Sequence, residues 1–213
     1  HRLHEVVRLS GMNIIVDDDD YPLIIKVASL PGARLQVYFL DNEEFFRRKF
    51  IFKDDKDKLF DDNQDRMVFF CKGVLETVKK FGWPPNLIHC HGWMTSLIPM
   101  YVHTVYKNDP IFRNTKVIYS VYNETIEDSF DDRFKDKATI NNLEEEALDK
   151  YFEKDKIRLH KGAIAYTDAM VEGSKDLDAD VTKAIESSKK PVLGYQEGDD
   201  APAAYFEFYK ELL

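Results

Sequence analysis

The chain has 213 residues, of which 44% are hydrophobic, and it carries a formal net charge of −9. Such a chain can bury the core of one ordinary domain or of one large α/β unit. Its basic residues are scattered among carboxylates, which argues against a nucleic acid or an anionic membrane surface as partner. No apolar stretch approaches the roughly 20 residues needed to cross a bilayer.

The amino-terminal part of the chain has the alternation and turn residues typical of β-structure. We predict four strands in it: residues 5–9, 12–16, 23–28 and 34–40. The first two are separated by Gly11, and the last two by a hairpin-like Pro31-Gly32 turn. The acidic run 17–20 is predicted to be a solvated turn rather than a metal site, because adjacent carboxylates on an extended chain point in different directions.

A polar loop over residues 53–65 leads into a predicted helix over residues 63–81. Asp62 or Asn63 is the expected N-cap. Apolar side chains recur at spacings of three and four along this segment, which indicates one buried face: Met67, Phe70, Val74, Val78 and Phe81.

The rest of the chain alternates between strand and helix patterns. We predict three strands, over residues 87–90, 116–121 and 169–172. We predict helices over residues 95–106, 142–165, 178–187 and 201–212. The second of these helices begins at a capping box formed by Asn142 and Glu145. The acidic segment 124–140 is expected to be mobile. This alternation predicts an α/β fold: one Rossmann-like, three-layer α/β/α domain over residues 1–213 with a mainly parallel sheet.

The last predicted helix carries an apolar stripe made of Tyr205, Phe208, Tyr209 and Leu212. We expect this stripe to dock on the domain, with roughly 1.5–3 kcal/mol from burial of each aromatic side chain. An exposed stripe would instead predict a homodimer contact.

The first residues, from His1 to Glu5, do not resemble a signal peptide. Cys71 and Cys90 lie among apolar residues, so we expect buried free thiols and a cytoplasmic protein. An α/β domain usually begins with a strand and a phosphate-facing loop, and we expect both to precede His1.

The segment His89-Cys90-His91-Gly92-Trp93 is the strongest candidate for a site. It follows the predicted strand 87–90 directly, and ligands of parallel α/β sheets bind at the carboxyl ends of strands. The chain has no G-x-G-x-x-G, no phosphate-binding P-loop, no G-x-S-x-G and no Cys-x-x-Cys. The residues alone therefore predict a Rossmann-like domain with a site after this strand.

Several segments, in order, resemble bacterial glycogen and starch synthases: Val37 to Asn42, Phe45-Phe46-Arg47, Asp62 to Phe70, Pro85 to Trp93, Asn114 to Asn123 and Lys161 to Ser174. The resemblance is dense over residues 35–125, patchier to 174 and absent afterwards. It implies the N-terminal, acceptor-side half of a GT-B fold, in which ADP-glucose donates glucose to an α-1,4-glucan with retention. It also implies that the second GT-B domain and the first strand lie outside this chain, and that no cofactor is needed.

Two positions depart from the family pattern. The family's His-x-His-Asp-Trp motif has Gly92 in the Asp place, and its Thr-x-His-Asn motif has Tyr122 in the place of the His that faces the glucosyl group. The resemblance leaves His91, Trp93 and Asn123 as substrate-binding residues and identifies no certain catalytic residue. Transfer also needs cations for the departing diphosphate, so we do not expect this chain alone to be a competent transferase.

Each of these residues also has a purely structural interpretation. His89 and His91 share one strand face, yet without a third ligand they predict hydrogen-bonded or core histidines rather than a metal site. Trp93 is either a packing residue or a sugar platform, and Asn123 either a ligand or a turn residue. Two hypotheses remain for the function: a glucosyltransferase of the glycogen/starch synthase type that needs other parts, or a catalytically inactive glucan-binding or regulatory module. Partners would be α-1,4-glucan and a nucleotide sugar.

Overall fold

The computed structural model describes residues 6–124, 126 and 130–213. Its centre is a four-stranded sheet in the order β4-β5-β8-β9, with every neighbouring pair parallel. These strands are β4 (Leu87–His91), β5 (Lys116–Val121), β8 (Ala169–Glu172) and β9 (Val192–Leu193). The three strands predicted for this sheet are confirmed. β5 is buried from Val117 to Val121, as expected of a parallel strand covered on both faces.

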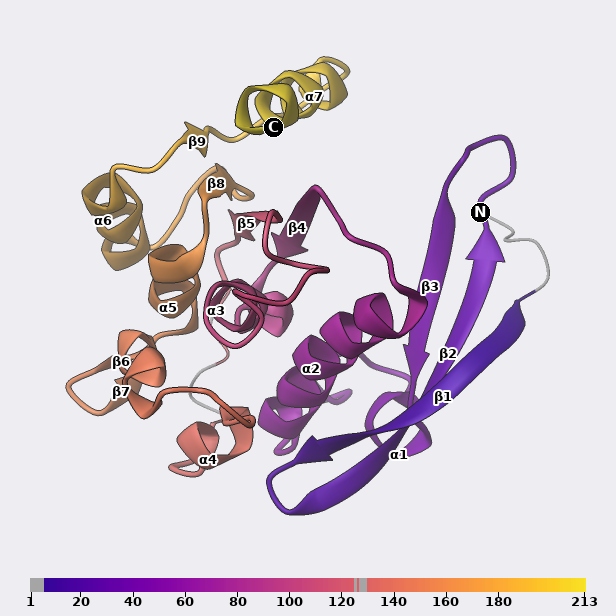
Figure 1. Cartoon of the computed structure of the whole chain (residues 1–213). Coiled ribbons are helices and arrows are strands. Elements are labelled where there is room, and N and C mark those ends of the chain that lie inside the picture. Colours follow the sequence, from indigo (N-terminus) through magenta and orange to yellow (C-terminus); the bar gives the residue numbers. More distant parts are fainter. Residues whose placement is uncertain (1–5, 125, 127–129) are drawn as a thin grey trace.

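Helices cover the two faces of this sheet, which confirms the Rossmann-like α/β prediction (Figure 1). The elements η1 (Trp93–Thr95), α3 (Ile98–His103), α5 (Leu159–Tyr166) and α6 (Ala179–Ser188) share one core with Val117, Tyr119 and Met170. Ile118, Ala169 and Val171 alternate with those residues, so they face the opposite side. There they pack against α7 (Ala201–Leu212).

The docking of α7 is confirmed. Phe208 is buried in the cluster, and Tyr205, Tyr209 and Leu212 are partly buried against it. The apolar stripe therefore packs on the parallel sheet of the same chain.

A second, antiparallel sheet stands apart from the parallel one (Figure 1). It consists of β1 (Val7–Val16), β2 (Asp19–Ser29) and β3 (Gln36–Asp41), followed by the short α1 (Glu43–Phe46). The predicted break at Gly11 is wrong, and β1 runs through this residue. Gly11 pairs with Ile24, and the register shifts only between Arg8 and Ser10. The predicted turn 17–20 is shorter, since Asp19 and Asp20 pair with β1.

Helix α2 (Asn63–Phe81) has the predicted bounds and lies between this antiparallel sheet and η1 and α3. Asp62 is its N-cap residue, but its side chain makes no cap hydrogen bond and forms an ion pair with Arg48 instead. Gly82 ends the helix in the left-handed conformation with φ of 63°, which glycine adopts without steric cost.

Two predicted helices were wrong in extent. In place of the helix 95–106 there is η1, which ends at Thr95, and the six-residue α3. The segment 142–165 is divided into η3 (Glu145–Tyr151), a hairpin of β6 (Phe152–Glu153) and β7 (Lys156–Ile157), and α5. Lys154 and Asp155 adopt φ values of 48° and 64°, and a positive φ at both central residues is typical of the type I′ two-residue hairpin turn.

The segment 124–140, for which we predicted mobility, includes residues 125 and 127–129, which lie outside the described residues. Within the described part, α4 (Phe134–Ala138) buries Phe134 and Ala138. No helix among the described residues is both long enough and apolar enough to span a membrane.

Candidate functional site

The predicted site residues meet at the carboxyl edge of the parallel sheet. β4 ends at His91 and β5 at Val121, and the Gly92 N–H donates to the Ser120 carbonyl at 3.0 Å, which holds the two strand ends together. The loop after β4 therefore carries Trp93 beside the loop after β5, which carries Asn123.

The rings of His89 and His91 lie side by side on β4, with their planes tilted by 31°. Their ring centroids are 4.1 Å apart. The ring nitrogens of His89 are hydrogen-bonded, Nδ1 to the Tyr209 hydroxyl at 2.6 Å and Nε2 to the Ser120 hydroxyl at 2.7 Å. Burial, together with the neighbouring His91, lowers the pKa of His89 to about 4, so this ring is neutral at pH 7.

His91 is linked to the next loop through Tyr122. Its Nδ1 lies 2.9 Å from the Tyr122 hydroxyl, and its pKa is lowered by burial. The Tyr122 ring lies against Gly173, where an added Cβ would approach it to 2.6 Å. Burial raises the pKa of Tyr122, so its hydroxyl is protonated at neutral pH. Tyr122, which occupies the family's histidine position, thus has its hydroxyl hydrogen-bonded to another residue of the protein, His91.

Trp93 lies in the core with only 2% of its surface exposed. Its ring is flanked by Phe52 and Phe130, with centroids 4.8 Å and 6.1 Å away. Its Nε1–H has no hydrogen-bond acceptor among the described residues. A buried donor without an acceptor lowers the stability of the folded state, so its presence calls for a structural or functional reason.

Gly92 and Glu124 meet at the same edge. Gly92 has φ of 69° and ψ of −178°, a backbone conformation that is essentially restricted to glycine. A Cβ placed on it would lie 2.9 Å from Glu124 Oε2, so this carboxylate lies close to where a side chain at position 92 would begin. The Trp93 backbone N–H donates to the same oxygen at 3.3 Å. Sequence reasoning missed Glu124 because its segment has no hydrophobic pattern.

Asn123 presents its side chain at the surface of this edge. Its backbone N–H donates to the Ser174 hydroxyl at 3.0 Å, which ties the loop after β5 to the segment after β8. The residue itself is exposed. Its amide is therefore accessible to a ligand.

A hollow of about 500 Å³ lies here, which we call the edge pocket. This volume is within the range of small-molecule sites. It is lined by Phe50, Ile51, Phe52, Lys53, Asp54, Asp57, Trp93, Asn123, Glu124 and Ile126. Two of the predicted binding residues, Trp93 and Asn123, thus share one pocket, while His91 lies beside it in the histidine–tyrosine network.

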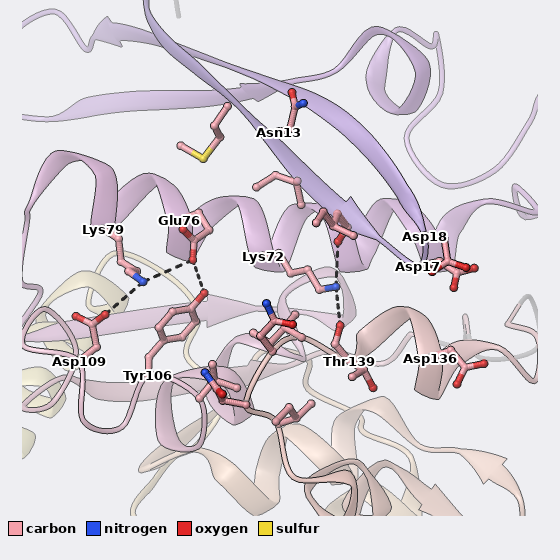
Figure 2. Close-up of a pocket in the computed structure, with 18 of the residues that line it drawn as sticks. Asn13, Asp17, Asp18, Lys72, Glu76, Lys79, Tyr106, Asp109, Asp136 and Thr139 are labelled. Carbon is pink, nitrogen blue, oxygen red and sulfur yellow. Dashed lines mark hydrogen bonds and ion pairs between the residues drawn. The ribbon is translucent and has the colours of Figure 1, made fainter.

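A larger hollow of about 1770 Å³, which we call the α2 groove, lies between β1, α2 and the segment 133–143. Figure 2 shows two groups of contacts in it: Lys79, Glu76, Tyr106 and Asp109 turned toward one another, and Lys72 pointing toward Thr139. The Lys72 ammonium donates to the carbonyls of Ile15, Lys137 and Thr139 at 2.9–3.0 Å. Glu76 accepts from Tyr106 at 2.5 Å, and Lys79 pairs with Asp109 at 3.4 Å.

Comparisons with known proteins agree with this architecture. The family model described as the starch synthase catalytic domain matches residues 1–189. The glycogen synthase of Chlorobaculum parvum is 32% identical over 194 residues, which cover 88% of this chain and 38% of that protein. The glycogen synthase of Chlorobium chlorochromatii is 41% identical over 127 residues, 57% of this chain and 25% of the relative.

Among solved structures, the catalytic domain of starch synthase IV from Arabidopsis thaliana, bound to ADP and acarbose, superposes with a TM-score of 0.73. It is 19% identical and the match covers 95% of this chain and 43% of that chain, so the likeness establishes the fold. This chain spans less than half the length of each of these relatives.

Proposed function

Because the chain belongs to the starch synthase catalytic domain family, we propose that it binds α-1,4-glucan at the carboxyl edge of its parallel sheet. In this proposal the chain is the acceptor-side half of a GT-B glucosyltransferase fold in glycogen biosynthesis. ADP-glucose is the family's donor, and the protein acts in the cytoplasm, where the buried free thiols of Cys71 and Cys90 stay reduced.

One observation carries the proposal: the edge pocket combines Trp93 and Asn123 with an exposed apolar rim. Phe50 is 39% exposed and Ile51 70% exposed at this rim. Sugars have apolar C–H faces and polar hydroxyl edges, so they bind where apolar groups lie beside hydrogen-bonding groups. The Asn123 amide both donates and accepts, as hydroxyl groups require.

We further propose that the chain does not transfer glucose by itself. Stabilisation of a departing diphosphate requires preorganised donors and cations at the reacting bond. The family's Asp and His positions hold Gly92 and Tyr122, and the Tyr122 hydroxyl is hydrogen-bonded to His91. Neither position supplies the family's side chain, which favours a glucan-binding or regulatory role over catalysis.

Two assays on the same protein test these statements separately. The chain is expected to be retained on immobilised glycogen and to release no ADP from ADP-glucose above the enzyme-free rate. Failure to bind glycogen would contradict glucan binding. Release of ADP would contradict the absence of transfer.

A further inference from the structure

We propose that Glu124 supplies the carboxylate that binds sugar hydroxyl groups in the edge pocket, in place of a carboxylate at position 92. The inference rests on the proposed function and deepens it, because it identifies the group that recognises the glucan. Gly92 and Glu124 come from different loops, after β4 and after β5, and the parallel pairing of these strands brings them together.

Contact geometry carries the first step. An added Cβ on Gly92 would lie 2.9 Å from Glu124 Oε2 and 3.5 Å from Oε1. The space that a side chain at position 92 would enter is therefore held by a carboxylate from position 124. A glycine at position 92 favours this arrangement, since a Cβ would force the Glu124 carboxylate to shift and the backbone conformation is strained for any other residue.

The second step concerns what the carboxylate can bind. The Trp93 backbone N–H donates to Oε2 and helps to fix the orientation of the group. A carboxylate has about four acceptor positions, so it can accept from a ligand and from the protein together. Two neighbouring sugar hydroxyls can donate to its two oxygens, and hydrogen bonds to a charged acceptor are stronger than neutral ones.

The remaining walls indicate which ligand fits. The Phe50 ring at the rim can cover a sugar face. The Trp93 Nε1–H is buried and lacks an acceptor among the described residues, so it would have to become uncovered to donate to a sugar hydroxyl. Among the described residues of the lining, Lys53 is the only basic one, against three carboxylates, and it pairs with Asp57 at 3.0 Å. This charge balance disfavours a diphosphate, so the pocket selects a neutral glucosyl unit over the nucleotide sugar.

Titration calorimetry with maltoheptaose tests the role of Glu124. Glu124→Gln removes the charge at constant size and is expected to weaken maltoheptaose binding by about tenfold or more. Glu124→Asp keeps the charge on a shorter side chain, so its affinity is expected to lie between those of Glu124→Gln and the unmodified chain. Glu172→Gln is the matched control, because it removes a carboxylate from the same sheet edge, at the end of β8, and is expected to change affinity by less than about twofold. ADP at the same concentrations is not expected to compete.

The outcomes separate this inference from the proposed function. If the unmodified chain binds maltoheptaose and Glu124→Gln binds it equally well, the role of Glu124 is wrong and glucan binding stands. Equal weakening by Glu124→Gln and Glu172→Gln would also overturn it, because general charge would then explain the effect. If the unmodified chain does not bind maltoheptaose, the proposed function fails and this inference fails with it.

Discussion

The α2 groove and the edge pocket differ in how their polar groups are satisfied. In the larger α2 groove, four charged side chains have polar partners: Lys72 contacts three backbone carbonyls, Glu76 contacts Tyr106, Lys79 contacts Asp109 and Asp17 contacts Arg133. In the edge pocket, the Trp93 Nε1–H lacks an acceptor among the described residues. By volume, the α2 groove would be the better candidate for a binding site. The unsatisfied hydrogen-bond donor instead favours the edge pocket.

The comparison gives each hollow a distinct physical role. The polar contacts of the α2 groove join β1, α2 and the C-terminal end of α4, so their loss is expected to reduce stability. The edge pocket is lined by Trp93, with its buried donor, and by the Glu124 carboxylate, and both contact or adjoin Gly92, whose glycine-only backbone conformation is of a kind that concentrates at functional sites. Substitutions in the two hollows should therefore affect different measurements.

The largest effect is expected for Gly92→Asp, beside the edge pocket. The backbone conformation costs about 1–3 kcal/mol for a non-glycine residue, and the new side chain would approach Glu124. We expect the free energy of unfolding in urea to fall by about 3 kcal/mol. Combination with Tyr122→His is not expected to start release of ADP from ADP-glucose.

Gly198→Asp is the control for Gly92→Asp. Gly198 also has a positive φ, of 82°, but nothing lies within 4 Å of an added Cβ. Its loss of stability is expected to be smaller, about 1 kcal/mol. Equal losses in the two variants would contradict the contact between position 92 and Glu124.

A substitution in the α2 groove, Lys72→Met, is expected to lower the free energy of unfolding by about 2 kcal/mol. It removes three hydrogen bonds from a charged donor, but it also removes the cost of burying a cation, since burial lowers the pKa of Lys72 to about 8. Chemical denaturation measures the change, with the exposed Lys80→Met as control. A loss of maltoheptaose affinity in folded Lys72→Met would contradict the separation of the two hollows.

Trp93→Phe tests the unpartnered donor. The smaller ring keeps the aromatic contacts with Phe52 and Phe130 but lacks the N–H. We expect affinity for maltoheptaose to fall about fivefold, the value of one neutral hydrogen bond, in calorimetric titrations of folded protein. Unchanged affinity would leave Trp93 with a packing role only.

The smallest effect concerns the pH dependence of stability through His89. Its folded pKa of about 4 lies below the ordinary value of 6.5, so the unfolded chain binds this proton first as the pH falls. His89 is thus expected to make stability fall between pH 6.5 and 4, and to have no such effect above pH 6.5. After allowance for its partial exposure the loss is about 1 kcal/mol. His89→Gln should remove this component from urea-unfolding curves measured across the range, and an unaltered pH slope would contradict it.

Much of the fold could be predicted because its signals are local. The apolar spacing of α2 defined its bounds, and the apolar runs of β4, β5 and β8 between helical patterns defined the parallel sheet. The β6–β7 hairpin was missed, because the charged residues 153–156 suit an exposed helix as well as a turn. The separation of the antiparallel sheet was also missed, since it depends on packing against α2.

The candidate site was only partly predictable for the same reason. Trp93 and Asn123 stand in recognisable motifs at strand ends, and the edge pocket contains both. Glu124 follows in a segment without pattern, and its relation to Gly92 depends on contact across two loops and on a backbone angle. Neither quantity can be obtained from residue spacing.

The most direct test of the central claim is a fluorescence titration of the Trp83→Phe variant with maltoheptaose. Trp93 is then the only tryptophan, and it lines the edge pocket. Trp83 is 42% exposed, packs on Tyr38 and Phe81, and is not among the residues that line that pocket. The account predicts a saturable change in Trp93 emission whose dissociation constant equals that from calorimetry. Calorimetric binding without any change in Trp93 emission would place the glucan elsewhere and contradict the account.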